Sequence, residues 1–215
     1  VAKLSNAGDW IWAIKVGGSD FDYSYDIALD PSDNIFISGY FVSSSISFGS
    51  TTLFNSGQTD VYVAKLSQSG SWLWAVKAGG SSSSMANGIA VDTSGNAYVV
   101  GQFGGTMTFD EYSLSSSGDY DVFVAKVSGS GTWQWALRAG GTENDYGWGI
   151  ATDSSANIYI TGSFFGNASF GDNGVSSRGT TDIFVAKIES SETSWEWAIS
   201  AGGSSGDQGK SIAVD

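Results

Sequence analysis

Three short motifs recur along this chain of 215 residues, each about 61 residues after its previous occurrence. They are Val-Ala-Lys, Trp-x-Trp and Ile-Ala-x-Asp. Their first residues are Val1, Val63, Val124 and Val185, then Trp10, Trp72, Trp133 and Trp195, then Ile27, Ile89, Ile150 and Ile212. A constant period of this length predicts a repeat architecture, in which each unit buries its apolar surface against its neighbours. Residues present in every copy are expected to serve folding, so residues that break the repeat are the better candidates for function.

One copy, residues 24–80, contains the signals of four short strands. The apolar run 27–29 ends in a polar turn at 30–34, and further β-rich runs follow at 35–39, 61–66 and 72–77. About twenty Gly- and Ser-rich residues separate the second run from the third. We expect them to form a packed loop, because Phe48 and Leu53 have counterparts at the same spacing in the other copies. Four antiparallel strands per repeat, without helical periodicity, predict an all-β fold, a β-propeller built of four-stranded blades.

The chain holds about 3.5 such repeats and is predicted to be a single propeller region, 1–215. Residues 1–23 form the end of one blade, 24–80, 86–141 and 147–203 form three blades, and 209–215 form the first strand of a further blade. These strands do not close a ring of complete blades. We therefore expect a segment of a larger propeller, or one that self-association completes. The absence of an initiator Met agrees with a processed chain or a piece of a longer one.

In combination, the motifs resemble the bacterial β-propeller repeat often called the SBBP repeat. The second copy reads Gly-Ile-Ala-Val-Asp-Thr-Ser-Gly-Asn-Ala-Tyr-Val-Val-Gly at 88–101 and continues Asp-Val-Phe-Val-Ala-Lys-Val at 121–127. The resemblance covers the whole chain. It implies a propeller within a large secreted or surface-attached bacterial protein, often acting in adhesion or as a spacer, and it supplies no catalytic residue. Two copies depart from the pattern, with Asp33 and Ala156 in place of the turn glycine.

Composition excludes several classes of function. A net charge of −13, from 22 acidic against 9 basic residues, disfavours binding to nucleic acid or anionic lipid. No apolar stretch approaches the roughly 20 residues that span a bilayer, so membrane insertion is not expected. The lack of His and Cys removes the usual general base, thiol chemistry and most zinc sites. No catalytic, cofactor or metal residue is assigned, although loop carboxylates in a fragment of a carbohydrate-active enzyme remain an alternative.

Two sets of repeated residues are predicted to be structural. Strand alternation places both Trp of each Trp-x-Trp pair on one face, where they would pack between blades rather than form a sugar-stacking platform. The Lys of Val-Ala-Lys follows an Asp by five residues in three copies, which favours a repeated charge pair over a binding patch. These residues are Lys65, Lys126 and Lys187 with Asp60, Asp121 and Asp182, and Lys3 is the fourth such Lys.

Acidic residues also cluster after the Gly-Gly pair that closes each copy. Asp22, Asp145 and Asp207 occupy the fourth position after it. We expect these carboxylates to accept backbone N–H bonds in the turn, with calcium binding as the alternative. Asp20, Asp22 and Asp26 together loosely resemble a calcium loop, but the glycine and the distal Glu of such a loop are missing.

Aromatic residues that break the repeat are the candidate ligand contacts. Tyr23, Tyr25, Tyr146 and Trp148, with Phe21 nearby, are expected in equivalent inter-blade loops, which gather at one end of a propeller. Such a surface could bind a protein or a glycan, although ordinary loop packing would also explain it. The favoured function is a non-catalytic module of the bacterial exterior or cell surface that binds protein or glycan, or spaces other domains. A self-associating structural propeller is the third hypothesis.

Overall fold

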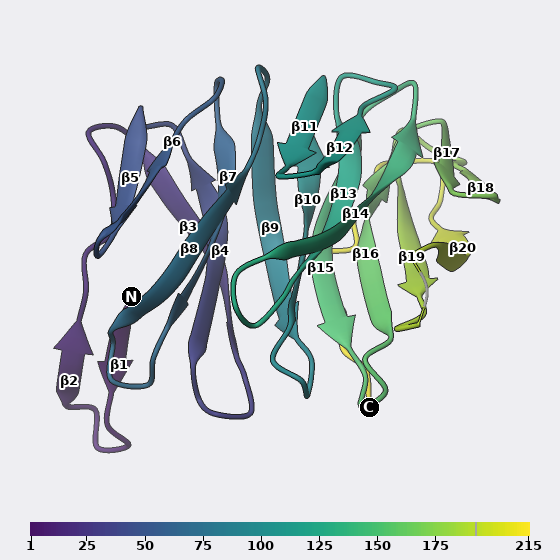
Figure 1. The fold of residues 1–215 in the computed structure, drawn as a ribbon. Coiled ribbons are helices and arrows are strands. Elements are labelled where there is room, and N and C mark those ends of the chain that lie inside the picture. Colours follow the sequence, from purple (N-terminus) through teal and green to yellow (C-terminus); the bar gives the residue numbers. More distant parts are fainter. Residues whose placement is uncertain (192) are drawn as a thin grey trace.

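The computed structural model describes residues 1–191 and 193–215, and the described residues form strands and turns without a helix. Three blades of four antiparallel strands stand side by side, confirming the predicted all-β propeller architecture (Figure 1), and a hairpin of the third blade extends the sheet of the second to six strands. The first blade comprises β3 (Asp22–Leu29), β4 (Ile35–Phe41), β7 (Asp60–Leu66) and β8 (Trp72–Ala78). The second comprises β9 (Ser84–Val91), β10 (Ala97–Phe103), β13 (Asp121–Val127) and β14 (Trp133–Gly141). The third comprises β15 (Asp145–Thr152), β16 (Ile158–Phe164), β19 (Asp182–Ile188) and β20 (Trp195–Ala201).

The first strands of neighbouring blades lie next to one another, and we call β3, β9 and β15 the inner strands. Hydrogen bonds join them directly. The amide of Ile89 donates to Asp26 Oδ2 at 2.9 Å, and Asn87 Nδ2 donates to the carbonyl of Gly147 at 2.7 Å. Each inner strand begins two residues before the predicted blade ranges, which matters for the candidate site.

Partial blades lie at both ends of the described chain. The third and fourth strands of one form the hairpin of β1 (Ala2–Leu4) and β2 (Trp10–Ala13). At the other end, residues 209–215 were predicted to form a strand but belong to no sheet. They lie beside the third blade, where the amide of Gly209 bonds the carbonyl of Gly162 at 3.2 Å. A first strand forms its ladder with the second strand of its own blade, and the described residues hold no such partner for this segment.

The long Gly- and Ser-rich segment of each copy was predicted to be a packed loop. In the structure it forms a small β-hairpin. The hairpins are β5 (Ser45–Phe48) with β6 (Thr51–Phe54), β11 (Thr106–Phe109) with β12 (Tyr112–Ser115), and β17 (Asn167–Phe170) with β18 (Asn173–Ser176). Their Phe side chains are buried in the core, as their spacing predicted. Polar Ser and Thr residues on the outward face hid the strand pattern.

Each hairpin also reaches back to the blade before it, and this contact explains the Gly-Gly pairs. Gly140 and Gly141, at the end of β14, pair with Ser169 and Ala168 of β17, and Gly79 pairs with Thr108 of β11. A Cβ on Gly80 or Gly141 would overlap a backbone carbonyl oxygen of the hairpin. Only glycine permits so close an approach between two backbones.

The core lies between blades, and the Trp-x-Trp pairs contribute to it from both sides. Trp133 packs edge-on against Phe109, with centroids 5.1 Å apart, in the apolar layer between the first and second blades. Trp135 belongs to the next layer, against Tyr98. On the neighbouring strand a β-bulge separates Val127 and Lys126, the residues that pair with these two Trp. The bulge breaks the alternation of side chains between the two faces of the sheet. Packing between blades is therefore confirmed, whereas the prediction that both Trp share one face is wrong.

The polar turn between the first two strands of a blade is held by its Asp. Asp30 accepts the amides of Ser32 and Asn34, both at 2.9 Å, and forms an ion pair with Lys65 at 3.0 Å. Burial alone would raise the pKa of this carboxyl, but the bonds from Asn34 and Lys65 outweigh it and lower the pKa to about 2. Asp33 follows with a φ of 60° at the position where Gly95 has 80°, so the departure from glycine retains the left-handed turn.

Two tryptophans at equivalent positions should differ sharply in their contribution to stability. Trp133 is 3% exposed and donates to the carbonyl of Lys77 at 3.1 Å, whereas Trp10 is 71% exposed. We expect Trp133→Ala to lower the free energy of unfolding by about 3–5 kcal/mol. Trp10→Ala should change it by less than about 0.5 kcal/mol. Urea unfolding followed by circular dichroism measures both changes. Equal losses of unfolding free energy would contradict the packing described for the fourth strands of the blades.

Candidate binding surface on the inner strands

The predicted ligand-contact residues lie on strands, not in inter-blade loops. Tyr23 and Tyr25 belong to β3, and Tyr146 and Trp148 belong to β15. Tyr25 and Trp148 are the bulged residues of their strands. The sequence prediction began each inner strand at its apolar Ile-Ala run, because a bulge interrupts the period-2 pattern just before it. The strand continues beyond the bulge to Asp22 and Asp145.

Four rings on the first blade form a continuous exposed row, which we call the first aromatic group. It consists of Phe21, Tyr23, Tyr25 and Tyr40. Tyr40 lies opposite Tyr23 across the β3–β4 ladder. Its ring centroid is 4.9 Å from that of Tyr23 and 5.6 Å from that of Tyr25. Phe21 is 70% exposed and Tyr25 is 52% exposed. A pocket of about 360 Å³, lined by Tyr25, Asp26 and Ile27 among others, adjoins the row.

A second aromatic group lies on β15 of the third blade, with one ring contributed by the segment before β13 of the second blade. Its members are Tyr120, Tyr146 and Trp148, with centroid separations of 6.3 and 5.9 Å. The Nζ of Lys210 lies 3.4 Å from the centroid of Trp148, and the indole N–H donates to Ser163 Oγ at 3.3 Å. This group is therefore covered by a cation from the chain itself, whereas the first group is open.

The structure does not bring the four predicted residues into one site. Between the two groups, β9 and β10 carry Met85, Asn87 and Gln102 at the equivalent positions. Asn87 bonds Gln102 Oε1 and the carbonyl of Gly147. No ring contact joins the two groups within residues 1–191 and 193–215.

The sequence did not point to two members of these groups, Tyr40 and Tyr120, or to Lys210, which covers Trp148. A signal existed for Tyr40, because its counterparts Gln102 and Ser163 are polar and it therefore breaks the repeat. Lys210 occupies the same repeat position as Tyr25, Asn87 and Trp148. Its place over Trp148 follows from blade packing, which no local pattern reveals.

Tyr40 and Tyr146 carry no charge near neutral pH, because the pKa of each is raised above its usual value. Burial, a hydrogen bond with Tyr25 and the charges of Tyr25 and Tyr23 raise the pKa of Tyr40 to about 12. Burial likewise raises the pKa of Tyr146. Burial lowers the pKa of Lys210, since an ammonium loses hydration where it is covered.

The acidic residues beside the first aromatic group bond to backbone amides rather than converging on one point. Asp22 Oδ2 accepts the amide of Gly18 at 2.6 Å and the hydroxyl of Ser43 at 2.9 Å. Asp20 Oδ1 accepts the amide of Phe21 at 2.8 Å, and Asp26 accepts the amide of Ile27 at 2.8 Å as well as that of Ile89. The described residues contain no group of three or more acidic side chains arranged to hold a metal ion.

The turn role predicted for the acid after Gly-Gly is confirmed in three copies. Asp22, Asp145 and Asp207 accept the amide of the second glycine, at 2.6, 2.6 and 2.9 Å. Asp145, at the start of the third blade, shares a buried site with Asp121 of the second blade. Burial is the main cause that raises the pKa of Asp145 to about 7. Backbone amides and Arg138 oppose the shift, and the Asp121 charge adds to it.

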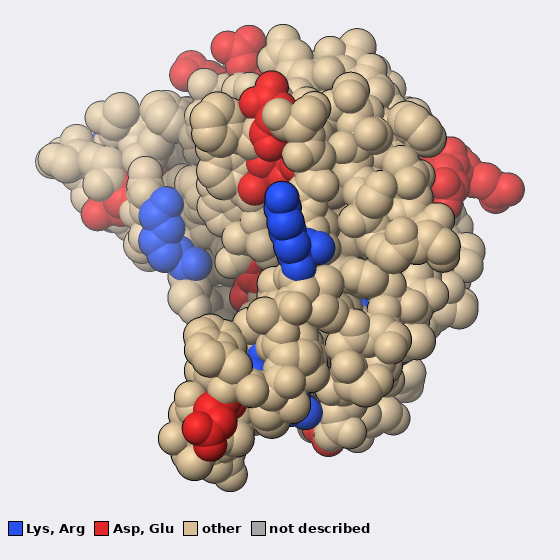
Figure 2. Space-filling view, turned by 90° about the vertical axis from the view of Figure 1, so that its left-hand side faces the viewer, with Lys and Arg blue, Asp and Glu red and all other residues tan. Residues whose placement is uncertain are grey.

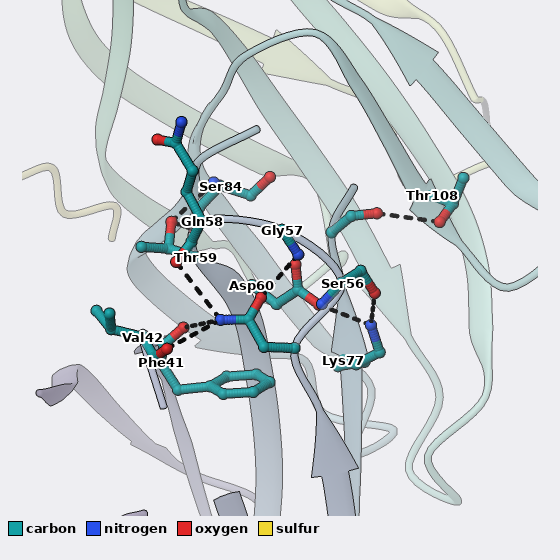
Figure 3. A network of polar contacts seen from close by, with 12 residues as sticks. Phe41, Val42, Ser56, Gly57, Gln58, Thr59, Asp60, Lys77, Ser84 and Thr108 are labelled. Atoms are coloured by element: carbon teal, nitrogen blue, oxygen red, sulfur yellow. Dashed lines mark hydrogen bonds and ion pairs between the residues drawn. The ribbon is translucent and has the colours of Figure 1, made fainter. Parts of the chain in front are cut away.

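The repeated charge pairs exist, but their partners differ from those predicted. Asp60 pairs with Lys77 at 2.6 Å, and Asp121 pairs with Arg138 at 2.5 Å, so the cation comes from the fourth strand of the blade. Figure 3 shows Lys77 lying between Asp60 and Ser56. The Lys of Val-Ala-Lys cannot reach the Asp five residues earlier, because about 3.3 Å per residue places them at opposite ends of the strand. Lys65 pairs with Asp30 instead, and Lys187 with Glu196 at 2.7 Å.

The third blade exchanges two residues of this arrangement. Arg178 replaces the Ser of the turn (Ser56, Ser117), and Ser200 stands where the other blades have Lys77 and Arg138. Asp182 is 1% exposed and accepts the amide of Arg178 at 3.1 Å. No ion pair of Asp182 is found in the described part of the chain.

Comparison with known proteins agrees with the fold, which defines a β-propeller repeat protein. The sequence model of the SBBP family, described as a beta-propeller repeat, matches residues 73–102 and 134–163. Each match runs from the fourth strand of one blade through the first two strands of the next. These two segments therefore match the SBBP-type repeat, as the motifs predicted.

A curated relative points to the same architecture. Over 163 residues the chain is 26% identical to the "Uncharacterized WD repeat-containing protein L264" of Acanthamoeba polyphaga mimivirus. The alignment covers 67% of this chain but 12% of the relative, so the chain spans about an eighth of the relative's length. WD repeats also form four-stranded propeller blades.

Among the described residues, no helix is both long and apolar enough to cross a bilayer.

The buried Asp145 predicts a specific pH dependence of stability. Its folded pKa of about 7 lies above the value of an unfolded Asp, near 3.9. The folded state therefore binds the proton more tightly, and the stabilisation is lost as the pH rises from about 4 to 7. We expect the free energy of unfolding to fall over this range by up to a few kcal/mol. The ionisation of Asp30, whose pKa is about 2, affects the free energy of unfolding only below this pH range.

The variant Asp145→Asn should remove most of this slope, because the amide does not titrate. Urea unfolding at a series of pH values between 4 and 8 measures the effect in both proteins. An unchanged slope in the variant would assign the pH dependence to other groups.

Proposed function

We propose that this chain is a non-catalytic propeller module that binds a protein or glycan ligand through the first aromatic group. The exposed row of Phe21, Tyr23, Tyr25 and Tyr40 carries this proposal. The repeat does not require these rings, since the second blade has none at the positions of Tyr23, Tyr25 and Tyr40. Contiguous exposed apolar and aromatic surface is typical of interaction sites.

The engagement of the carboxylates supports a non-catalytic role. Asp145, the acid with the most suitable pKa for proton transfer, is 1% exposed and bonded to backbone amides, so a substrate does not reach it. The oxygens of Asp22 and Asp26 are used in the same way. The alternative is a carbohydrate-active enzyme fragment that uses loop carboxylates, and the bonds already made by Asp22 and Asp26 do not favour it.

The proposed location is the exterior or surface of a bacterial cell, in adhesion or as a spacer within a larger protein. This part of the proposal rests on the resemblance to SBBP repeats and on the acidic, cysteine-free composition. The WD-repeat relative supports a role in binding other proteins only at the level of the fold.

Binding by the first aromatic group can be tested on arrays of defined glycans and peptides. We expect Phe21→Ala/Tyr25→Ala to weaken the ligands that bind the natural protein by about tenfold, since each lost stacking contact is worth about 0.5–1.5 kcal/mol. Tyr112→Ala, which removes a 37% exposed ring on hairpin strand β12, serves as the control and should leave binding unchanged. Retention of every ligand by the double variant would refute the proposed site.

A second candidate function is self-association, and the uncovered face of the first blade favours it. Ile27 and Leu29 are 56% and 58% exposed, although their counterparts Ile89 and Val91 pack in the layer between blades. A pocket of about 340 Å³, lined by Ile27, Leu29 and Ile35 beside Val1, opens there. On the side of the molecule where the first blade lies, Figure 2 shows a mainly uncharged surface, with a run of acidic side chains next to a basic one near its middle. We propose a second copy of the chain as the occupant.

Light scattering behind a sizing column tests this candidate. The expected mass is about 45 kDa, twice the 22.4 kDa of one chain. Ile27→Asn should shift it towards one chain, because a buried amide without partners costs about 1–3 kcal/mol. Leu73→Asn, at a residue 52% exposed on β8, is the matched control and should have no effect. A natural protein that stays monomeric at high concentration would exclude self-association through this face.

A further inference from the structure

We propose that the ligand of the first aromatic group is a cationic side chain, a Lys or Arg of a basic segment in a partner protein. This inference rests on the proposed function and specifies its ligand. Three features of the inner strands support it. A cation lies at the equivalent position of the third blade, acidic residues surround the first aromatic group, and the nearby carboxylate oxygens already accept hydrogen bonds.

The third blade shows what the equivalent position binds. Trp148 and Tyr25 hold the same place in the repeat, and each is the bulged residue of its inner strand. Over Trp148 lies the ammonium of Lys210, 3.4 Å from the ring centroid, supplied by the segment that follows the third blade. At the first blade the corresponding residue of the next inner strand is Asn87, which bonds elsewhere. Tyr25 therefore presents the same kind of ring without a cation from the chain.

The charge near the first aromatic group favours a cation. Asp20, Asp22 and Asp26 lie within the same seven-residue stretch as its rings, and no Lys or Arg forms an ion pair with them in the described part of the chain. The chain as a whole carries a net charge of −13. Carboxylates beside the rings add to the attraction that an aromatic face exerts on an ammonium or guanidinium group.

The nearby polar atoms disfavour a neutral sugar. A glycan site combines ring stacking with hydrogen bonds from its hydroxyls to free side-chain acceptors. Both oxygens of Asp22 and of Asp26 already accept bonds from the chain itself. A carboxylate used in this way has fewer free lone pairs for a sugar hydroxyl, whereas its charge still attracts a cation at a distance. The observations therefore favour a basic protein segment over a glycan.

The test compares a short lysine-rich peptide with the same peptide acetylated on every lysine, by isothermal titration against the intact chain. Acetylation removes the charge and keeps the length. We expect the unmodified peptide alone to bind, with an affinity that falls as salt rises. Tyr23→Leu/Tyr25→Leu should weaken binding about tenfold, because a cation–π contact is worth about 0.5–1 kcal/mol at an exposed site.

Two further variants separate the rings from bulk charge and from misfolding. Tyr25→Phe keeps the ring and should keep the affinity, and Tyr112→Leu removes an exposed ring elsewhere and should also keep it. Equal binding of the peptide to Tyr23→Leu/Tyr25→Leu would show mere attraction to the acidic chain and would overturn the inference. Neutral glycans that bind through these rings, without the lysine peptide, would overturn it while the proposed function stands. Absence of both kinds of ligand would refute both.

Discussion

The structure depends on the apolar layers between blades, to which each fourth strand contributes one Trp on each side. The bulge at Trp133 and Trp135 sends one ring back towards Phe109 and the other forward towards Tyr98. Three of these indoles, those of Trp74, Trp133 and Trp195, also donate to a backbone carbonyl across a layer. A four-stranded sheet has two apolar faces and cannot bury either alone, so this contribution to both neighbours is what makes the repeats cohere.

The other repeated residues also hold neighbouring blades together along these apolar layers. The small hairpins insert a Phe into each layer, and the Gly-Gly pairs allow the hairpin backbone to lie against the preceding blade. Buried carboxylates such as Asp60 then bind the turn after the hairpin and a cation of the fourth strand. Because the second and third strands of the blades, with the hairpins, provide most of the buried residues, the bulged positions of the inner strands are free to vary.

The sequence was sufficient for the architecture and insufficient for the details that a bulge or a distant blade decides. The period and the motifs predict the blades, because every copy repeats the same strand and turn signals. The same-face placement of the two Trp failed at a bulge, and the inner strands were started too late for the same reason. The partner of Asp60 was missed because Lys77 approaches it across a strand pair, and spacing along one strand does not report such neighbours.

The candidate site shows how a repeat protein acquires function without disturbing its fold. One position of the repeat holds Tyr25, Asn87, Trp148 and Lys210 in successive copies. In the third blade the aromatic ring and the following Lys satisfy each other, and in the second an amide bonds the next inner strand. In the first blade the ring meets no such partner and joins Tyr23 and Tyr40 in an exposed row. The same backbone geometry therefore holds a contact between a ring and a cation in one copy and leaves an aromatic row exposed in another.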